Sequence, residues 1–505
     1  MHFSIPDTQE FFNDTTGSTY TGFNIHINGS FHCCLRFKQL HSLHEQLKRS
    51  LAASSSTSNV TLPSFPPKKL LPLTNNQIEA RRIALEHYVQ IVGQDPIISK
   101  SELLRTFLLS AQQESASIDT RETTIDVHLM NGFRISVNCY TNEYSLKVLS
   151  KACQNIDLPC SYINYFSLFL MRKDKDGGVI LIRKLMDFES PYISQRIAED
   201  CQIVIRKSYW DPCYDIQLMQ DKIALNLLFI QTISDIERDW IIVGPDVKKE
   251  LRNLQERGNK KEYIEIARNL PSYGCVQFSS AVVDYPEPNN IAVITVGNRE
   301  LSIRSHLGQK IHETKFRVTR MRCWRVTTIH NNEEENTSSL DNSTQSLELS
   351  FEYLMSKNCL KWITIASDQA MLISVCLQGM VDELIHQKDG NQYIYKSDTV
   401  PYQPMCYIRR DGSSANQICD SSSSDTLSSL VCHKIFLKNL KNFFLKLVCY
   451  FYSQNNDIDM PIQSQSNFLS MRRKIKNKMS TTVFFRNGRE SVHNEAFEGI
   501  GDDDL

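Results

Sequence analysis

Hydrophobic residues alternate with polar ones in the first forty positions in the way that a β-hairpin requires. Apolar side chains occupy every second position from 23 to 27 and again from 31 to 37, and the dipeptide Asn28-Gly29 separates the two runs. Because Asn-Gly tolerates the positive φ angles of a tight turn, the pattern predicts two antiparallel strands. Apolar residues at helical spacing from 40 to 47 and from 78 to 92 predict two helices, with a Ser-rich loop between them.

Three further blocks of the chain have different periodicities. From 123 to 185 the pattern predicts a strand pair, a helix and another strand pair, which is the order of a ubiquitin-like β-grasp. Helical spacing dominates from 208 to 270, and strands return after Tyr273. These predicted strands span 276–283, 291–296, 301–303, 316–326, 347–353 and 361–365. One last helix begins near Ser367 or Asp368, and the whole series predicts an α+β multidomain protein.

Basic and aromatic residues stand at three points of the first unit from which they can meet. Arg36-Phe37 ends the hairpin, Lys68 follows the rigid pair Pro66-Pro67, and Arg81 opens the next helix. Arginine grips a phosphate through two parallel hydrogen bonds, whereas lysine acts as a point charge. These side chains can converge on one phosphorylated headgroup, with Phe37 as a flat apolar surface beneath a ring. The plain alternative is a set of solvated surface charges.

The set and the order of these residues resemble the PX domain, whose usual ligand is phosphatidylinositol 3-phosphate. The resemblance assigns the phosphate contacts to the three basic residues and places Phe37 beneath the inositol ring. By helical count Arg81 fits better than Arg82. Lys68 fits better than Lys69 in the loop, and both neighbours stay as alternatives.

An apolar loop follows the basic one. Leu70, Leu71 and Leu73 surround Pro72, and we expect them to be exposed and to enter a bilayer beside the headgroup site. The alternative is that these leucines belong to the core of the domain.

Composition and cysteine usage restrict the class of protein. At 505 residues the chain is long enough for three or four units, and a hydrophobic content of 41% allows sizeable cores. A net charge of −1 excludes a strong overall field, so we expect local anion sites and no nucleic-acid partner. The 15 cysteines include no Cys-x-x-Cys pair, which argues against zinc and disulfide scaffolds and favours a reducing, cytosolic compartment. We also expect no signal peptide and no membrane-spanning segment.

A β-grasp, a helical lobe and a strand-rich lobe closed by a helix form the three-lobe plan of a FERM domain, whose third lobe has a phosphotyrosine-binding or pleckstrin-like shape. A PX domain followed by such a module resembles the small PX–FERM-like class of sorting nexins. The stretches that carry this resemblance are FPPKKL at 65–70, RKSYWD at 206–211, SDIER at 234–238, FRVTRMRCWRV at 316–326, FEYLMSK at 351–357 and AFEGIGDDDL at 496–505. We place the units at 1–112 (PX), 122–207 (ubiquitin-like lobe), 208–272 (helical lobe), 273–390 (phosphotyrosine-binding-like lobe) and 391–505 (tail).

Third lobes of this kind commonly bind an extended peptide by adding it as a strand to a sheet edge, beside the closing helix. The candidate edge is 320–326, where Trp324 and Val326 share one face. The helix offers Leu377, Met380 and Val381, with Leu384 beyond them. The resemblance implies that the ligands are Asn-Pro-x-Tyr-type motifs in the cytoplasmic tails of receptors of the lipoprotein receptor and integrin type. The alternative is that all these residues are plain core.

The tail has a different composition from the rest of the chain. Residues 413–430 are Ser-rich with few apolar positions, which predicts a mostly disordered segment. A Phe-, Leu- and Lys-rich stretch at 433–452 fits a helix lying on a membrane, a partner-docking helix or an insert without function. The basic run at 471–478 fits an anionic membrane contact or a solvated segment.

The chain ends in small apolar residues, acids and a terminal leucine. Such an ending is a compact peptide that a basic, apolar-lined pocket can capture, although a merely solvated acidic end has the same composition. The resemblance implies that this ending recruits the retriever part of the Commander assembly. The residues concerned are Ile500, Gly501, Asp503, Asp504 and Leu505.

Catalytic signatures are absent from the sequence. It contains no phosphate loop, no Gly-x-Gly-x-x-Gly, no Gly-x-Ser-x-Gly and no His-Glu-x-x-His, so we expect no catalytic residues, metal or cofactor. The resemblance implies an endosomal cargo adaptor that is cytoplasmic, peripheral on early endosomes, and recycles receptors to the cell surface. The alternative is a membrane-associated signalling scaffold that binds a small GTPase through the ubiquitin-like lobe.

Overall fold

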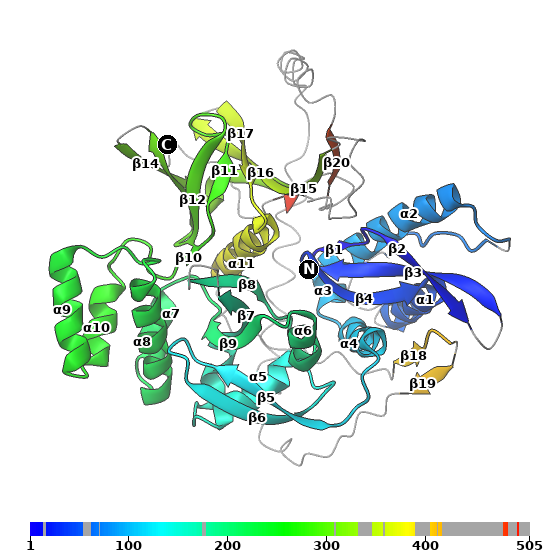
Figure 1. Cartoon of the computed structure of the whole chain (residues 1–505), viewed down its shortest axis with the longest axis horizontal. Coiled ribbons are helices and arrows are strands. Elements are labelled where there is room, and N and C mark those ends of the chain that lie inside the picture. Colours follow the sequence, from blue (N-terminus) through cyan, green and yellow to red (C-terminus); the bar gives the residue numbers. More distant parts are fainter. Residues whose placement is uncertain are drawn as a thin grey trace, which may run out of the picture. The chain divides into compact units, whose positions relative to one another are not determined.

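The computed structural model describes most of the chain up to residue 388 and short segments beyond it (Figure 1). The described residues are 1–13, 17–53, 62–69, 71–173, 178–307, 310–331, 346–356, 359–388, 405–411, 413–416, 478–482 and 492–493. The chain divides into two units, and the elements below belong to the one formed by 1–415 with 479–505. The second unit, 416–478, lies almost wholly outside the described residues.

The first domain is a small antiparallel sheet packed against helices. Its strands are β1 (Phe3–Ser4), β2 (Thr8–Asn13), β3 (Ser18–Ile27) and β4 (Ser30–Arg36), with β3 paired to the other three. Its helices are α1 (Phe37–Ala53), α2 (Asn75–Gln94), α3 (Pro96–Ser99) and α4 (Glu102–Ala116). Asn28 and Gly29 have φ angles of 48° and 79°, so the predicted β3–β4 turn is confirmed.

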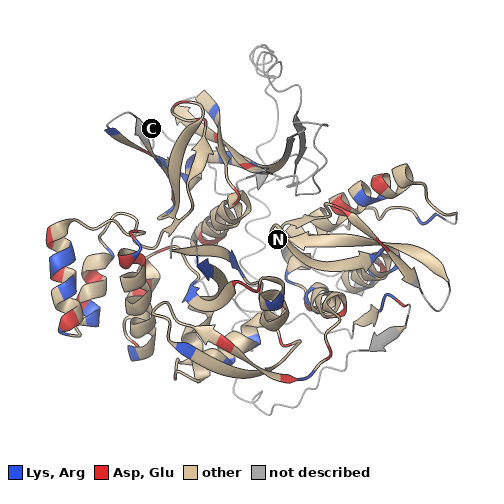
Figure 2. Ribbon diagram, in the orientation of Figure 1, with Lys and Arg blue, Asp and Glu red and all other residues tan. Residues whose placement is uncertain are grey.

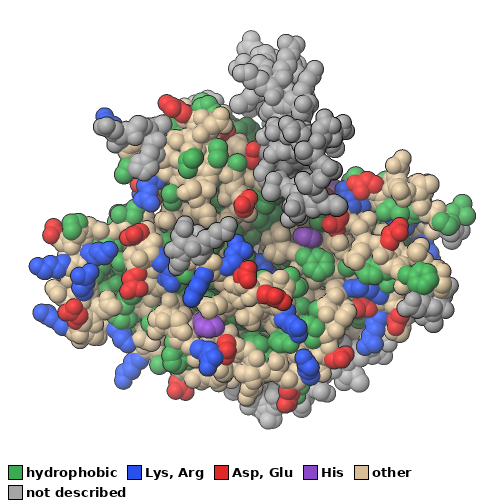
Figure 3. Space-filling model, viewed as in Figure 1, with side chains coloured by type: hydrophobic (Ala, Val, Ile, Leu, Met, Phe, Trp, Pro, Cys, Tyr) green, Lys and Arg blue, Asp and Glu red, His purple; other side chains and the backbone are tan. Residues whose placement is uncertain are grey.

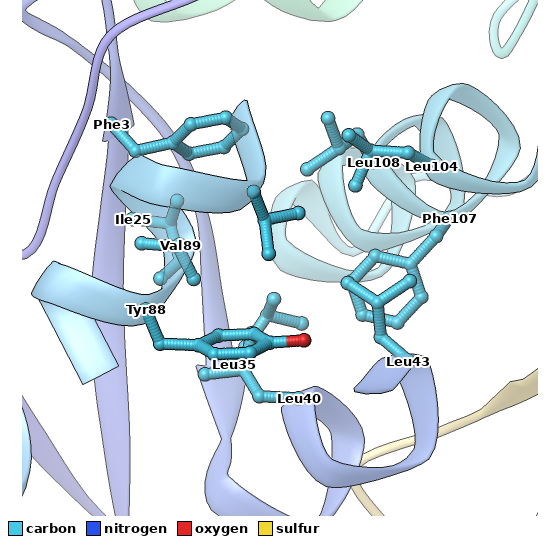
Figure 4. A pocket seen from close by; sticks show the side chains of 11 residues that line it. Phe3, Ile25, Leu35, Leu40, Leu43, Tyr88, Val89, Leu104, Phe107 and Leu108 are labelled. Carbon is cyan, nitrogen blue, oxygen red and sulfur yellow. The ribbon is translucent and has the colours of Figure 1, made fainter. Parts of the chain in front are cut away.

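The core of this domain contains a very small cavity. Eleven apolar side chains from the sheet, α1, α2 and α4 line it, among them Phe3, Tyr88 and Phe107 (Figure 4). Its volume of about 10 Å³ is room for one water molecule at most, and its walls offer that water no polar partners. It is a packing gap and not a ligand site.

The second domain is a five-stranded sheet with the order β6-β5-β9-β7-β8. Its elements are β5 (Glu122–His128), β6 (Arg134–Tyr140), α5 (Ser145–Gln154), η1 (Cys160–Tyr165), β7 (Phe166–Lys173), β8 (Val179–Lys184), α6 (Pro191–Ile197) and β9 (Cys201–Lys207). The predicted hairpin–helix–hairpin order is confirmed, but the sequence interpretation missed β9. This strand lies at the centre of the sheet, parallel to β5 and antiparallel to β7.

Four helices make up the helical lobe: α7 (Cys213–Leu218), α8 (Lys222–Glu237), α9 (Pro245–Glu256) and α10 (Lys260–Ala267). Their buried residues share one apolar cluster with those of the β-grasp sheet, so the two lobes have a common core. Basic and acidic residues are intermixed along α9 and α10 (Figure 2).

The third lobe is a strongly bent antiparallel sheet closed by a helix. It contains β10 (Val276–Gln277), β11 (Ala281–Val283), β12 (Asn290–Gly297), β13 (Glu300–Leu307), β14 (Lys310–Arg317), η2 (Val318–Arg320), β15 (Met321–Asn331), β16 (Ser346–Ser356), β17 (Cys359–Ala366) and α11 (Ala370–Lys388). The helix begins two residues later than Asp368, and the Ser367 hydroxyl accepts a hydrogen bond from the Gln369 N–H. Figure 1 shows α11 against the strands, and its buried residues join theirs in one cluster.

One expectation about this part of the chain needs correction, and one short pair of strands was not predicted. The strand predicted from 316 to 326 is broken at η2, because buried Val318 turns the chain from β14 into β15. Within the tail, which is expected to be mostly disordered, β18 (Cys406–Ile408) pairs with β19 (Ser414–Asn416), and Met405 and Tyr407 are buried in the core of the first domain. Two apolar side chains alternating over three residues are too short a pattern to reveal a strand without its long-range partner.

Candidate lipid and peptide sites

The guanidinium of Arg36 lies at the end of β4 and is held on two sides. Its central carbon stands 3.8 Å above the centre of the Tyr20 ring on β3. Its Nη1 donates a 2.5 Å hydrogen bond to the backbone carbonyl of Arg410. The next residue, Phe37, begins α1, so Arg36 also stands at the positive end of a 17-residue helix.

Phe37 belongs to an aromatic cluster that joins α1 to the loop before α2. Its ring centre lies 5.3 Å from that of Phe65, and Phe65 in turn contacts His41, His44 and Tyr88. Phe65 precedes the Pro-Pro-Lys-Lys loop, and this packing therefore fixes the root of the loop that carries Lys68.

The guanidinium of Arg81 covers the Phe37 ring at 4.3 Å. Its Nη2 atom is buried and has no hydrogen-bond partner among the described residues, and burial lowers the pKa of this group. Neighbouring Arg82 is differently placed, because it forms ion pairs with Glu79 at 2.6 Å and Glu86 at 3.5 Å and donates to the Ile5 carbonyl.

The remaining residues of the predicted lipid site lie on the proline loop and beyond it. Lys68 and Lys69 are exposed. Leu71 is 80% exposed, whereas Leu73 is half-buried and Leu70 lies outside the described residues. The structure thus places Arg81 over Phe37 in this aromatic cluster, whereas Arg36, the residue before Phe37, lies over Tyr20. Sequence reasoning missed Tyr20 and Phe65, and the one signal for Phe65 was its position directly before Pro66-Pro67.

The residues predicted to receive a peptide come together between β15 and α11. Trp324, Val326, Leu377, Met380 and Val381 are each at most 1% exposed and share one cluster. The Trp324 Nε1 donates a 2.9 Å hydrogen bond to the Ser374 hydroxyl, which ties the strand to the helix. Their side chains are therefore core in character, as the plain alternative holds.

The backbone of the same strand is a pairing edge. β21 (Val492–His493) runs antiparallel to β15, with Trp324 opposite Val492 and Cys323 opposite His493, and β20 (Lys478–Thr482) also borders β15. A register shift between Met321 and Cys323 marks a bulge at the start of this strand. The edge thus accepts a short added strand.

The far end of α11 is anchored to the helical lobe. The buried Glu383 carboxylate accepts hydrogen bonds from the backbone N–H groups of Trp210 and Asp211, at 2.9 and 2.6 Å. Asp211 in turn pairs with Arg299 at 2.9 Å. The RKSYWD stretch therefore fixes the helix that lies beneath the β15 edge.

Three further observations concern the C-terminal residues, metal or membrane-spanning features, and the charge of the surface. Ile500, Gly501, Asp503, Asp504 and Leu505 lie outside the described residues. No group of side chains in the described part of the chain could hold a metal ion, and no helix there is long and apolar enough to cross a bilayer. On the face shown in Figure 3, basic, acidic and hydrophobic side chains are intermixed, as the small net charge suggests.

Comparison with known families gives four consecutive matches. The models describe a PX domain at 23–111, the sorting nexin 17/27/31 FERM F1 lobe at 123–210, the sorting nexin 17/31 FERM F2 lobe at 211–271 and the sorting nexin 17 FERM C-terminal domain at 274–385. Among curated relatives, human sorting nexin-17 is 46% identical over 395 residues, which are 77% of this chain and 83% of that protein. Zebrafish (Danio rerio) sorting nexin-17 is 44% identical over 396 residues (77% and 82%), and human sorting nexin-31 is 34% identical over 392 residues (76% and 86%).

Solved structures give a more distant likeness. The human myosin 7b C-terminal MyTH4-FERM domain in complex with the harmonin-a PDZ3 domain matches with a TM-score of 0.34 and 14% identity, over 64% of this chain and 72% of that one. A Dictyostelium discoideum myosin VII MyTH4-FERM domain matches with a TM-score of 0.33 and 12% identity, over 68% and 74%. At these values nothing further is drawn from the likeness.

A PX domain followed by three FERM lobes defines a class of non-enzymatic sorting adaptors, in which the PX domain implies phosphoinositide binding and the FERM module implies binding of peptide motifs in receptors. Within this class, the curated relatives described above are sorting nexin-17 and sorting nexin-31. The chain belongs to the sorting nexin 17 family of PX–FERM sorting nexins. The predicted family and fold class are thus confirmed, and the chain is an endosomal sorting adaptor that associates peripherally with membranes.

Proposed function

We propose that this adaptor binds phosphatidylinositol 3-phosphate through Arg36, Lys68 and Arg81, with Phe37 supporting the headgroup. It would then hold Asn-Pro-x-Tyr-type motifs of receptor tails at β15 and pass the cargo to retriever through its last residues. The observation that carries the lipid assignment is the lack of acidic partners. Among the described residues none of these three cations forms an ion pair, whereas adjacent Arg82 forms two.

Burial of one guanidinium nitrogen supports the same assignment. A buried guanidinium nitrogen without an acceptor, such as Nη2 of Arg81, is costly unless a ligand supplies the acceptor. Arg36 and Arg81 are both stacked on aromatic rings, so their planes are fixed before a ligand arrives. Two oriented guanidinium groups, one directly before α1 and one on α2, fit a headgroup that carries more than one phosphate.

The test is flotation of the purified chain with vesicles of phosphatidylcholine, with and without phosphatidylinositol 3-phosphate. Arg36→Ala and Arg81→Ala should each weaken lipid-dependent binding by roughly 10- to 150-fold, which corresponds to about 1.5–3 kcal/mol for a charged hydrogen bond. Lys69→Ala removes an exposed neighbouring charge and serves as the matched control, with an expected loss below about threefold. Wild-type binding that ignores the phosphoinositide would refute the assignment.

The cargo assignment is supported by the edge that β15 offers. A peptide added there gains main-chain hydrogen bonds, and the buried apolar cluster of Trp324, Val326, Leu377, Met380 and Val381 holds the strand in place beneath it. Because β21 pairs with Cys323 and Trp324, the strand geometry needed for such addition is present, and a peptide at these positions would take the place of β21.

Hydrogen exchange can locate the peptide without mutating core residues. An Asn-Pro-x-Tyr peptide should slow amide exchange in 321–326, and the same peptide with Ala in place of Asn should not. Protection confined to the β-grasp or helical lobe would contradict the assignment. For retriever, a chain that lacks Leu505 should fail to capture the purified complex while it binds the peptide normally.

A further inference from the structure

A hairpin that follows the FERM module packs between α1 and α4 of the PX domain. Met405 and Tyr407 are 2% and 3% exposed and belong to the PX core, where the Tyr407 ring lies 5.5 Å from that of Phe107. The Gln46 carboxamide on α1 meets the backbone of Cys406 on both sides, accepting from its N–H at 3.0 Å and donating to its carbonyl at 2.9 Å. The segment is therefore bound in one register, as a strand would be.

Polar contacts fix this segment between α1 and α4. The Tyr407 hydroxyl donates to the Glu114 carboxylate at 2.8 Å, and the Arg410 N–H donates to the other Glu114 oxygen at 2.7 Å. The Gln39 amide donates to the Ile408 carbonyl at 2.9 Å. The Arg410 Nη2 donates to the Ser115 hydroxyl at 2.7 Å, close to the place where the β4 strand ends. A network with this many satisfied partners holds the hairpin in a single arrangement.

The hairpin reaches the lipid site through one backbone carbonyl. The Arg410 carbonyl accepts from Nη1 of Arg36 at 2.5 Å, while Tyr20 covers the guanidinium plane. An arginine has five N–H donors, so one bond to a carbonyl leaves the Nε and Nη2 edge for a two-bond grip on phosphate. We propose that the β18–β19 hairpin is part of the phosphoinositide site and acts by positioning the Arg36 guanidinium, an inference that rests on the proposed function.

The charges of the hairpin indicate that it positions the Arg36 guanidinium and does not block it from a phosphate. A segment that imitates phosphate would present an anion to Arg36, but here the contact is a neutral carbonyl. The one carboxylate of the turn, Asp411, accepts from the N–H and the hydroxyl of Ser413, both at 2.7 Å. Arg409 is exposed and adds a positive charge to the hairpin. The hairpin therefore orients the cation and leaves its charge available.

The test uses the full chain and titrates it calorimetrically with soluble inositol 1,3-bisphosphate, which isolates the headgroup from the bilayer. Tyr407→Ala removes the central anchor, and we expect Kd to rise about tenfold while the stoichiometry stays at one. Tyr407→Phe keeps the ring but loses the bond to Glu114, and we expect a smaller rise. Cys406→Ala leaves both backbone bonds to Gln46 intact and is the matched control, with an expected change below twofold.

A second measurement separates positioning from a simple loss of folded protein. Vesicle flotation with the 3-phosphate and the 4-phosphate isomers should show a reduced preference for the 3-phosphate in Tyr407→Ala, because a less constrained Arg36 discriminates less. A reduced stoichiometry at unchanged Kd and unchanged preference would make the hairpin a purely structural element and overturn the inference. Tighter binding would overturn it too, since the hairpin would then obstruct the site.

The outcome for Arg36→Ala distinguishes this inference from the proposed function. If that variant abolishes binding while both Tyr407 variants bind like wild type, only the role of the hairpin is refuted. If the wild type ignores both the soluble headgroup and the phosphoinositide vesicles, the proposed function fails and the role of the hairpin fails with it.

Discussion

The buried ion pair between Arg183 and Glu189 offers a quantitative prediction, because it lies where the PX domain meets the β-grasp lobe. The two side chains form two parallel hydrogen bonds of 2.6 and 2.9 Å, and Glu189 is 2% exposed. The Ser194 hydroxyl donates to the same carboxylate at 2.7 Å. Ser194 and Ser190 both bond to the side chain of Gln112 on α4. The carboxylate therefore organises the contact between the two domains.

We expect Glu189→Ala to destabilise the folded unit by about 3–5 kcal/mol, since it leaves Arg183 partly buried without an acidic partner. If the PX domain and the β-grasp lobe, roughly 200 residues together, unfold as one, that corresponds to a fall in Tm of roughly 6–20 °C, which differential scanning fluorimetry measures directly. The double variant Arg183→Met with Glu189→Leu replaces the pair by apolar groups of similar volume and should recover most of the loss.

The ion pair of Glu189 also predicts how the free energy of unfolding depends on pH. Burial alone would raise the pKa of Glu189, but the charge and hydrogen bonds of Arg183 outweigh burial and hold this pKa below its usual value. Its contribution is therefore present above the unfolded pKa near 4.3 and is lost as the pH falls through the folded value. A Glu189→Ala cost below about 1 kcal/mol, or a double variant no more stable than the single one, would refute this reasoning.

Two other predictions concern a buried histidine and an exposed leucine. Burial lowers the pKa of His32 to about 4. The neutral ring should therefore contribute its full stabilisation above pH 6.5, and the free energy of unfolding should fall by about 3 kcal/mol by pH 4. His32→Gln should flatten this part of a Tm-against-pH profile. Leu71→Asp should weaken vesicle binding by roughly 10-fold or more without changing the Kd for the soluble headgroup, because burial of a leucine side chain in the bilayer contributes about 1.5–3 kcal/mol. The control is Ile97→Asp on α3, where the isoleucine is also exposed; this variant should change neither the vesicle binding nor the Kd. Equal losses in both assays would show that Leu71 acts in folding and not in membrane contact.

Local patterns predicted the elements that short-range chemistry determines. The Asn28-Gly29 turn and the alternation around it define β3 and β4 within fifteen residues, and the helical spacing of apolar positions located α2 and α11. The elements missed depend on distant partners. β9 is a central strand whose neighbours β5 and β7 come from other parts of the lobe, and η2 turns the chain where only the packing of Val318 requires it.

In the candidate site, too, local sequence indicates some of the residues, and others depend on contacts with distant parts of the chain. Residue type and order indicated Arg36, Lys68 and Arg81, because phosphate chemistry favours such side chains wherever they stand. Residue type and order do not show which of Arg81 and Arg82 lacks an acidic partner, because that depends on the ion pairs of Arg82 with Glu79 and Glu86. The contact of Arg36 with Arg410 joins residues 374 positions apart, and no sequence pattern indicates it.

The position of the β18–β19 hairpin in the chain also affects the order of events during synthesis. The PX helices are complete by Ala116, but Met405 and Tyr407 join the core of this domain only after the whole FERM module has been made. At roughly 5–20 residues per second, that interval lasts on the order of 15–60 seconds. A nascent PX domain therefore lacks the contact of Arg36 with the Arg410 carbonyl until the FERM lobes have been made. A fragment that stops before residue 405 would keep this immature state permanently.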